Sequence, residues 1–225
     1  MKPTLPTLLS LNAGFVDTAG FLALHGLFTS HVTGNFVTFA AAMVLGTTGA
    51  VGKLLALPVF CLFVFLTRLF GDGFRRRERS ALAPALAVKV VLLLAAAGMA
   101  SYFGPFPDGD TLPALATGMS LVAAMAIQNA VHRVHLSDAP PSTVMTMTTT
   151  QIMIDIADIF SGAADATAAA RARLSRMSVS VAAFALGCAT AAALYYFYGM
   201  WCFLAPPVLA LWALKASAFT RPAKV

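Results

Sequence analysis

Apolar segments alternate with short polar or glycine-rich connections along the whole chain. A membrane-spanning helix needs about 20 predominantly apolar residues, and most of the segments approach that length. The pattern therefore predicts an all-α fold, a polytopic transmembrane helix bundle. We expect the helices to lie in segments 7–27, 33–45, 54–70, 84–103, 113–131, 143–160, 177–198 and 201–219.

Two of these segments are poor candidates for a simple membrane-spanning helix. Segment 33–45 is short, and segment 143–160 is diluted by threonines and by Asp155 and Asp158. Non-helical backbone survives in the bilayer core only within protein or beside a cavity, because its polar groups need partners. We predict broken or re-entrant helices at residues 30–35 and 142–150. We expect hydroxyl and amide side chains of the first of these stretches to cap the short helix that follows.

The composition supports a membrane protein and excludes an ordinary soluble one. Of the 225 residues, 59% are hydrophobic and 11% are charged, and the mean hydropathy is +0.82. A soluble domain has about 25% charged residues. Residues 1–225 are therefore expected to form a single membrane domain. We interpret the net charge of +6 as a topology signal carried by cations in the connections, not as a nucleic-acid surface.

The distribution of lysine and arginine favours about six net crossings. If all the segments crossed, the cations would divide evenly between the two faces. If segments 7–27 and 33–45 together make one crossing, and segments 113–131 and 143–160 another, Lys53 alone faces outward. The positive-inside rule selects this second topology and places the N- and C-termini in the cytoplasm. We expect the first segment to be a retained helix and not a signal peptide, since no cleavage site follows it.

The two halves of the chain share the same order of segments. Residues 7–103 and 113–219 align at an offset of about 112 residues, which places Asp17 on Asn129. Three net crossings per half would make the halves antiparallel, which is the inverted-repeat plan of many secondary transporters. We therefore predict two inverted repeats.

Polar side chains within the apolar segments are the candidate substrate- or ion-binding residues. An unpaired carboxylate in a bilayer is expensive, so Asp17 is expected to face the bundle interior, with a role in charge or proton transfer or a structural bond to His31 or Asn129. The same alternative, bonding between helices, applies to the amides and hydroxyls. The candidates are Asp17, His31, Thr33, Asn35, Gln128, Asn129 and Thr146.

Two motifs resemble a known family. The first is Gly14-Phe-Val-Asp17-Thr-Ala-Gly20-Phe followed by Phe28-Thr-Ser-His31-Val-Thr33-Gly34-Asn35, and the second is Gln128-Asn129-Ala130 followed by Thr143 and Met145-Thr146. Together they resemble the signature of the YoaK-like family of bacterial integral membrane proteins. The resemblance implies a six-helix protein of the bacterial inner membrane. Met147 stands where the family often has a glycine in the second motif.

The sequence favours a secondary transporter or channel for a small polar solute or ion. No nucleotide-binding, metalloprotease or hydrolase motif is present, so we expect neither an enzyme nor a cofactor or metal site. The alternative is a non-transporting membrane scaffold or a protein that senses lipid or a partner. Expected partners are membrane lipid and the small polar solute or ion. The small-residue stretch 182–193 allows close packing within one chain or in a homodimer.

Overall fold

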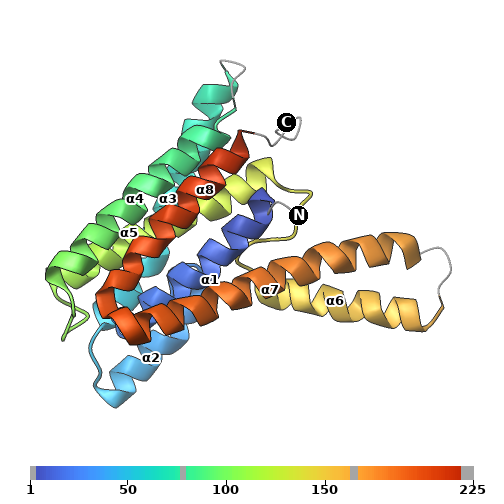
Figure 1. The fold of residues 1–225 in the computed structure, drawn as a ribbon. Helices are drawn as coiled ribbons and strands as arrows, with labels where there is room; N and C mark the ends of the chain where they lie inside the picture. The colour runs from blue at the N-terminus through green and yellow to red at the C-terminus, as the bar shows by residue number, and fades with distance from the viewer. Residues whose placement is uncertain (1–3, 77–79, 163–166, 219–225) are drawn as a thin grey trace.

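The computed structural model describes residues 4–76, 80–162 and 167–218, and within them the regular structure is helical (Figure 1). This confirms the predicted all-α bundle. In chain order, the helices are α1 (Leu5–Ala23), η1 (Val32–Gly34), α2 (Asn35–Leu45), α3 (Ala50–Arg75), α4 (Leu82–Phe103), α5 (Leu112–His135), α6 (Met145–Phe160), α7 (Thr167–Tyr198), η2 (Gly199–Leu204) and α8 (Ala205–Ser217). The two η elements are short 3₁₀ helices.

Several helices have the length and the apolar surface that a bilayer requires. Four stretches of the described chain are long and apolar enough to cross a membrane, namely Ala50–Phe74, Leu82–Phe103, Leu112–His135 and Ala170–Ser217. Large apolar side chains such as Val91 and Leu94 of α4 remain exposed on the outside of the bundle. Exposed apolar surface on this scale is unfavourable in water and fits contact with lipid.

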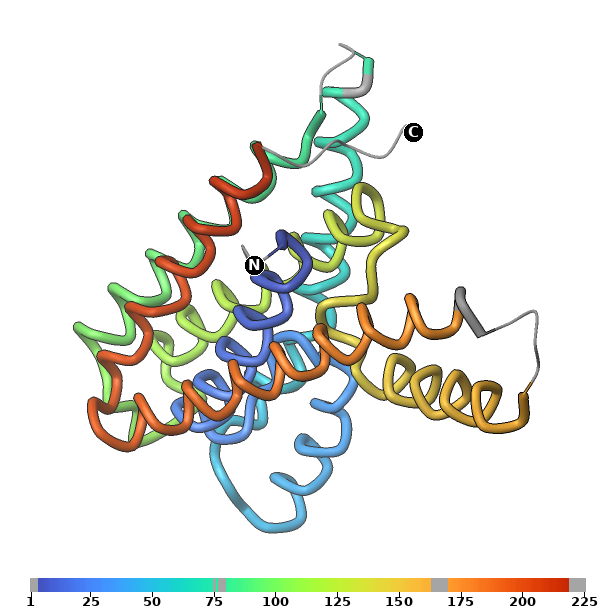
Figure 2. Tube along the Cα trace, turned by 45° about the vertical axis from the view of Figure 1, so that its right-hand side comes forward, coloured from blue at the N-terminus to red at the C-terminus, as the bar shows by residue number. Residues whose placement is uncertain are grey.

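The packing partners of the helices follow a reciprocal pattern. α1 packs against α7 and α8, which lie in the second half of the chain. α5 packs against α3 and α4, which lie in the first half. α1 and α5 run in opposite directions, so that α1 begins and α5 ends toward the same end of the bundle (Figures 1 and 2). α4 and α8 lie side by side, and α6 projects from the bundle with the first part of α7.

Two glycines allow α1 and α7 to approach closely. A Cβ atom at Gly187 would lie 2.9 Å from the backbone nitrogen of Phe15 and closer still to the carbonyl oxygen of Leu11. A Cβ atom at Gly14 would lie 2.9 Å from the carbonyl carbon of Phe184. The small-residue stretch 182–193 thus packs against α1 of the same chain.

We expect Gly187→Leu to destabilise the protein, because the steric cost of the new side chain exceeds the gain in helix propensity when glycine is replaced. The new side chain would collide with α1 backbone, and overpacking of this kind costs about 1–3 kcal/mol or more. Thermal unfolding of the purified protein in detergent measures the effect. Gly98→Leu on α4 is the matched control, because a Cβ there meets no atom within 4 Å. Equal melting temperatures for the two variants would contradict the packing.

The projecting α6–α7 hairpin is held by a buried carboxylate. Asp155 of α6 accepts hydrogen bonds from the guanidinium of Arg173 on α7, including one from Nε to Oδ2 of 2.9 Å. Gln151 donates to the same carboxylate over 2.9 Å. Asp155 therefore serves to join two helices.

Three details of the sequence prediction were wrong. The first break already begins after Ala23, and the second lies at residues 136–144, so the predicted stretch 145–150 is helical. The cap of α2 is Gly34, and no side chain caps η1 or α2. Finally, the cations are not confined to the connections, and Lys89 is the clearest exception. It lies in the middle of α4 and is fully buried.

Candidate functional site

The first break is a turn of non-helical backbone held by Asp17. The chain leaves α1 through His25 and Gly26, both of which have positive φ angles, 54° and 85°. Asp17 Oδ1 then accepts hydrogen bonds from the backbone N–H groups of Thr29 and Ser30, each 2.8 Å long, and from the Thr29 hydroxyl. A carboxylate inside α1 thus satisfies backbone donors that the break would otherwise leave unpaired.

His31 completes this cluster. Its Nδ1 lies 2.5 Å from Asp17 Oδ2, and its ring packs edge-on against Phe184 of α7, with centroids 5.5 Å apart. The His31 side chain is 38% exposed, whereas Asp17 is buried. An imidazole that joins a buried carboxylate to the exterior has the geometry to pass a proton or balance a charge.

Asn35 braces the same break from the other side. Its Oδ1 accepts from the backbone N–H of Phe28 over 2.9 Å, and its Nδ2 donates to the Phe28 carbonyl over 2.8 Å. Both ends of the amide are therefore used within the protein. A solute that took the place of Phe28 at Asn35 would have to replace both of these bonds.

The second break is held in a similar way from α5. Asn129 Oδ1 accepts a hydrogen bond of 2.6 Å from the Thr143 hydroxyl. Gln128 Nε2 donates to Ser142 Oγ over 3.0 Å. Each pair is separated by 14 residues in the sequence, which is the same separation as between Asp17 and His31. In both α1 and α5, a polar side chain thus contacts a residue 14 positions later, in the break that follows the helix.

Lys89 is a member of the site that sequence reasoning missed. It is 0% exposed, and its Nζ donates to Gln128 Oε1. Gln128 Nε2 also donates to the carbonyl oxygen of Leu9 over 3.0 Å. The signal was present, since Lys89 interrupts an apolar segment of spanning length. It was hidden because all the cations were counted as topology determinants.

Comparison with known proteins identifies the family. A family model described as a protein of unknown function (DUF1275) matches residues 5–216. The chain belongs to the DUF1275 family. The UPF0700 transmembrane protein YoaK of Bacillus subtilis (strain 168) is 29% identical over 168 residues, which are 69% of this chain and 68% of the relative. No solved structure matches significantly.

The comparison confirms the resemblance to the YoaK-like family. With a transmembrane relative and apolar helices of spanning length, this DUF1275 protein is a multi-pass membrane protein. The two motifs that carry the resemblance are the two breaks and the polar side chains that hold them.

The predicted site residues of this DUF1275 protein form two separate clusters. One comprises Asp17, His31 and Asn35, and the other comprises Gln128 and Asn129. Gln128 contacts α1 at Leu9, eight residues before Asp17, which corresponds to about 12 Å along a helix. Thr33 and Thr146 are exposed and lie outside both clusters.

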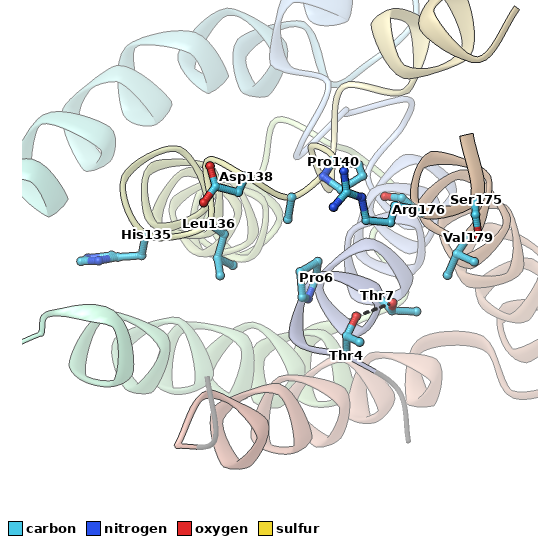
Figure 3. Close-up of a pocket in the computed structure, with 12 residues that line it drawn as sticks. Thr4, Pro6, Thr7, His135, Leu136, Asp138, Pro140, Ser175, Arg176 and Val179 are labelled. Carbon is cyan, nitrogen blue, oxygen red and sulfur yellow. Dashed lines mark hydrogen bonds between the residues drawn. The ribbon is translucent and has the colours of Figure 1, made fainter. Parts of the chain in front are cut away.

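A cavity of about 510 Å³ lies beside the second break, between the start of α1, residues 136–140 and the first half of α7 (Figure 3). None of the predicted site residues lines it. Its polar walls come from three different elements, as Figure 3 shows for Thr7, Asp138 and Arg176. The cavity also includes Ser180, whose hydroxyl lies 2.8 Å from that of Ser10.

Proposed function

We propose that this membrane protein is a secondary transporter or channel for a small polar solute or ion, built from two inverted repeats. The observation that carries the proposal is the pair of breaks, each held by polar side chains of the preceding long helix. Reciprocal packing of α1 and α5 with helices of the opposite half supports the repeat. Broken helices in antiparallel halves are a recurrent plan for moving a solute through a bilayer.

The Asp17 cluster and the Asn129 cluster would bind the solute or ion one after the other as it crosses the membrane. In the present arrangement the side chains that hold each break are bonded within the protein, so both breaks are closed, although the buried Ser30 hydroxyl in the first break has no hydrogen-bond partner among the described residues. A polar solute that supplies equivalent hydrogen bonds would replace contacts such as Thr143 to Asn129 and release the break. Asp17 and His31 would carry charge or a proton, while the amides of Asn35, Gln128 and Asn129 and the hydroxyls of Thr33 and Thr146 would meet the solute.

We further propose that the protein lies in the bacterial inner membrane with both termini in the cytoplasm. α3 and α8 end at the end of the bundle where α1 begins (Figure 1), and Lys215 lies in the last turn of α8, while Arg68 lies about two turns before the end of α3. Asp110 belongs to the α4–α5 connection at the other end, where its carboxylate accepts from the backbone N–H groups of Gly49 and Val51. This charge asymmetry supports the orientation.

Flux into proteoliposomes tests the function. The panel would cover small uncharged polar solutes, measured by osmotic swelling, and small ions, measured by electrical current. We expect at least one member of the panel to cross faster with wild-type protein than with empty liposomes. We expect Asp17→Asn and Asn129→Ala to lose that flux. Wild-type flux in both variants would contradict the proposed roles.

The cavity in Figure 3 favours a second candidate, a membrane protein that senses anionic lipid without transport. Arg176 and His135 contribute to its walls, and an arginine near a membrane surface attracts phosphate groups. This candidate predicts no flux for any solute. It also predicts that Arg176→Gln weakens binding to vesicles that contain anionic lipid.

A further inference from the structure

The amine of Lys89 occupies an unusual position for a charged group. Leu86, on one side of it along α4, belongs to one buried apolar cluster, and Leu93, on the other side, belongs to a second. Lys89 is completely enclosed by these surroundings, and Gln128 Oε1 accepts its hydrogen bond. The acceptor is neutral, so the lysine has an amide partner and no counter-charge there.

The charged and titratable groups on the neighbouring elements do not pair with Lys89. α4 packs against α5, α8 and η2, and none of their groups in the described chain forms an ion pair with the amine. These groups are His132, Arg133 and His135 on α5, Lys215 on α8 and Cys202 on η2. Because an unpaired charge is strongly disfavoured in apolar surroundings, this packing accommodates a neutral amine at Lys89 better than an ammonium.

Gln128 connects Lys89 to the second break by hydrogen bonds. Its Oε1 accepts from Lys89, while its Nε2 donates to Ser142 in the break and to the Leu9 carbonyl of α1. A single amide therefore joins α1, α4, α5 and the break. A charged ammonium at Lys89 would need water or a counter-charge. It can reach either one only if the contacts among α1, α4, α5 and the break loosen.

We propose that Lys89 is a proton-binding site and that its protonation opens the second break. In this step a proton adds to the lone pair of Lys89 Nζ, and only hydrogen bonds are exchanged. A proton fits the site because it needs no cavity, whereas an anionic ligand would need an opening that the packed helices do not provide. The role of this proton rests on the proposed function: in a transporter, the proton bound at Lys89 is the coupling ion.

Hydrogen–deuterium exchange of the full-length protein in lipid nanodiscs tests the proposal with the proton itself as the probe. Exchange of residues 136–144 is measured between about pD 8 and about pD 6 and corrected for the intrinsic exchange rate. In wild type we expect protection to fall as pD falls, by up to about tenfold for each unit, the limit for one linked proton. In Lys89→Met protection should not change with pD. Lys89→Gln, which keeps a hydrogen-bonding group at this position but does not titrate, should behave in the same way if the methionine variant does not fold.

Two further variants separate Lys89 from other sources of pH dependence. Lys53→Met alters another buried lysine, located on α3, and should retain the wild-type response. His132 Nε2 lies 3.4 Å from the carbonyl of Ala139 inside the same break, so His132→Gln is the decisive comparison. A response that survives in both Lys89 variants but disappears in His132→Gln overturns the proposal, as does a wild type without any response.

The outcome is independent of whether a transported solute is found. Exchange is read without solute, so a response lost on replacing Lys89 supports the proton site even if all flux measurements are negative. Conversely, flux together with opening that does not depend on Lys89 overturns the proton site and leaves the proposed transport intact.

Discussion

Replacing Asp17 with alanine is expected to collapse the first break and abolish the folded protein at moderate temperature. The carboxylate accepts the backbone N–H groups of Thr29 and Ser30 and contacts the His31 ring. Each buried donor left without a partner costs about 1–3 kcal/mol, and the losses fall on adjacent residues. Thermal unfolding in detergent, followed by circular dichroism, should show a large fall in melting temperature. Asp17→Asn, which keeps one acceptor oxygen, should lie between alanine and wild type.

Asp138→Ala is the matched control for this prediction. Asp138 is an exposed carboxylate in the 136–144 break, and a surface substitution of this kind usually changes stability by less than about 0.5 kcal/mol. A melting temperature for Asp17→Ala within the error of the Asp138→Ala value would show that the first break does not depend on the carboxylate.

The second large effect is expected at Gln128. Gln128→Leu fills a similar volume but leaves Lys89, Ser142 and the Leu9 carbonyl without the amide that joins them. Loss of the acceptor for a buried amine alone should cost about 1–3 kcal/mol. The same unfolding measurement should therefore show severe destabilisation.

A double-mutant cycle isolates the contact between Lys89 and Gln128. Lys89→Met combined with Gln128→Leu replaces both polar partners with apolar side chains, which is often nearly neutral. We expect the double variant to be more stable than Gln128→Leu alone, with a coupling energy of about 0.5–3 kcal/mol. Additive effects of the two substitutions would mean that the contact has no energetic role.

Much of the first cluster could be predicted from the sequence. A carboxylate within an apolar segment must find donors nearby, and the Asp17–His31 pair was one of the structural bonds that the sequence suggested. The alignment of the halves also placed Asp17 on Asn129, and each of these residues contacts a side chain 14 residues further along. Local spacing was informative here because each long helix and its break are adjacent in the chain.

The second half was harder to predict for physical reasons. The threonines at 146–150 resembled a break, yet hydroxyls of Thr148 and Thr150 bond to carbonyls four residues earlier and are compatible with a helix. α7 begins ten residues before the expected start at 177, because its polar first turns are supported by the pair between Arg173 and Asp155. Neither the hydroxyl bonds nor the ion pair between helices has a distinct sequence pattern.

The central claim is that movement of the breaks carries the solute, and a reversible lock of the second break tests it most directly. Pro141→Cys and Ser180→Cys would be combined in a background with serine at Cys61, Cys188 and Cys202, since the Ser180 hydroxyl of α7 donates to the Pro141 carbonyl of the break over 3.3 Å and neither residue belongs to the proposed solute site. The account predicts that oxidation to the disulfide stops flux of every solute that the reduced protein carries, and that reduction restores it. Undiminished flux through the oxidised protein would contradict the account.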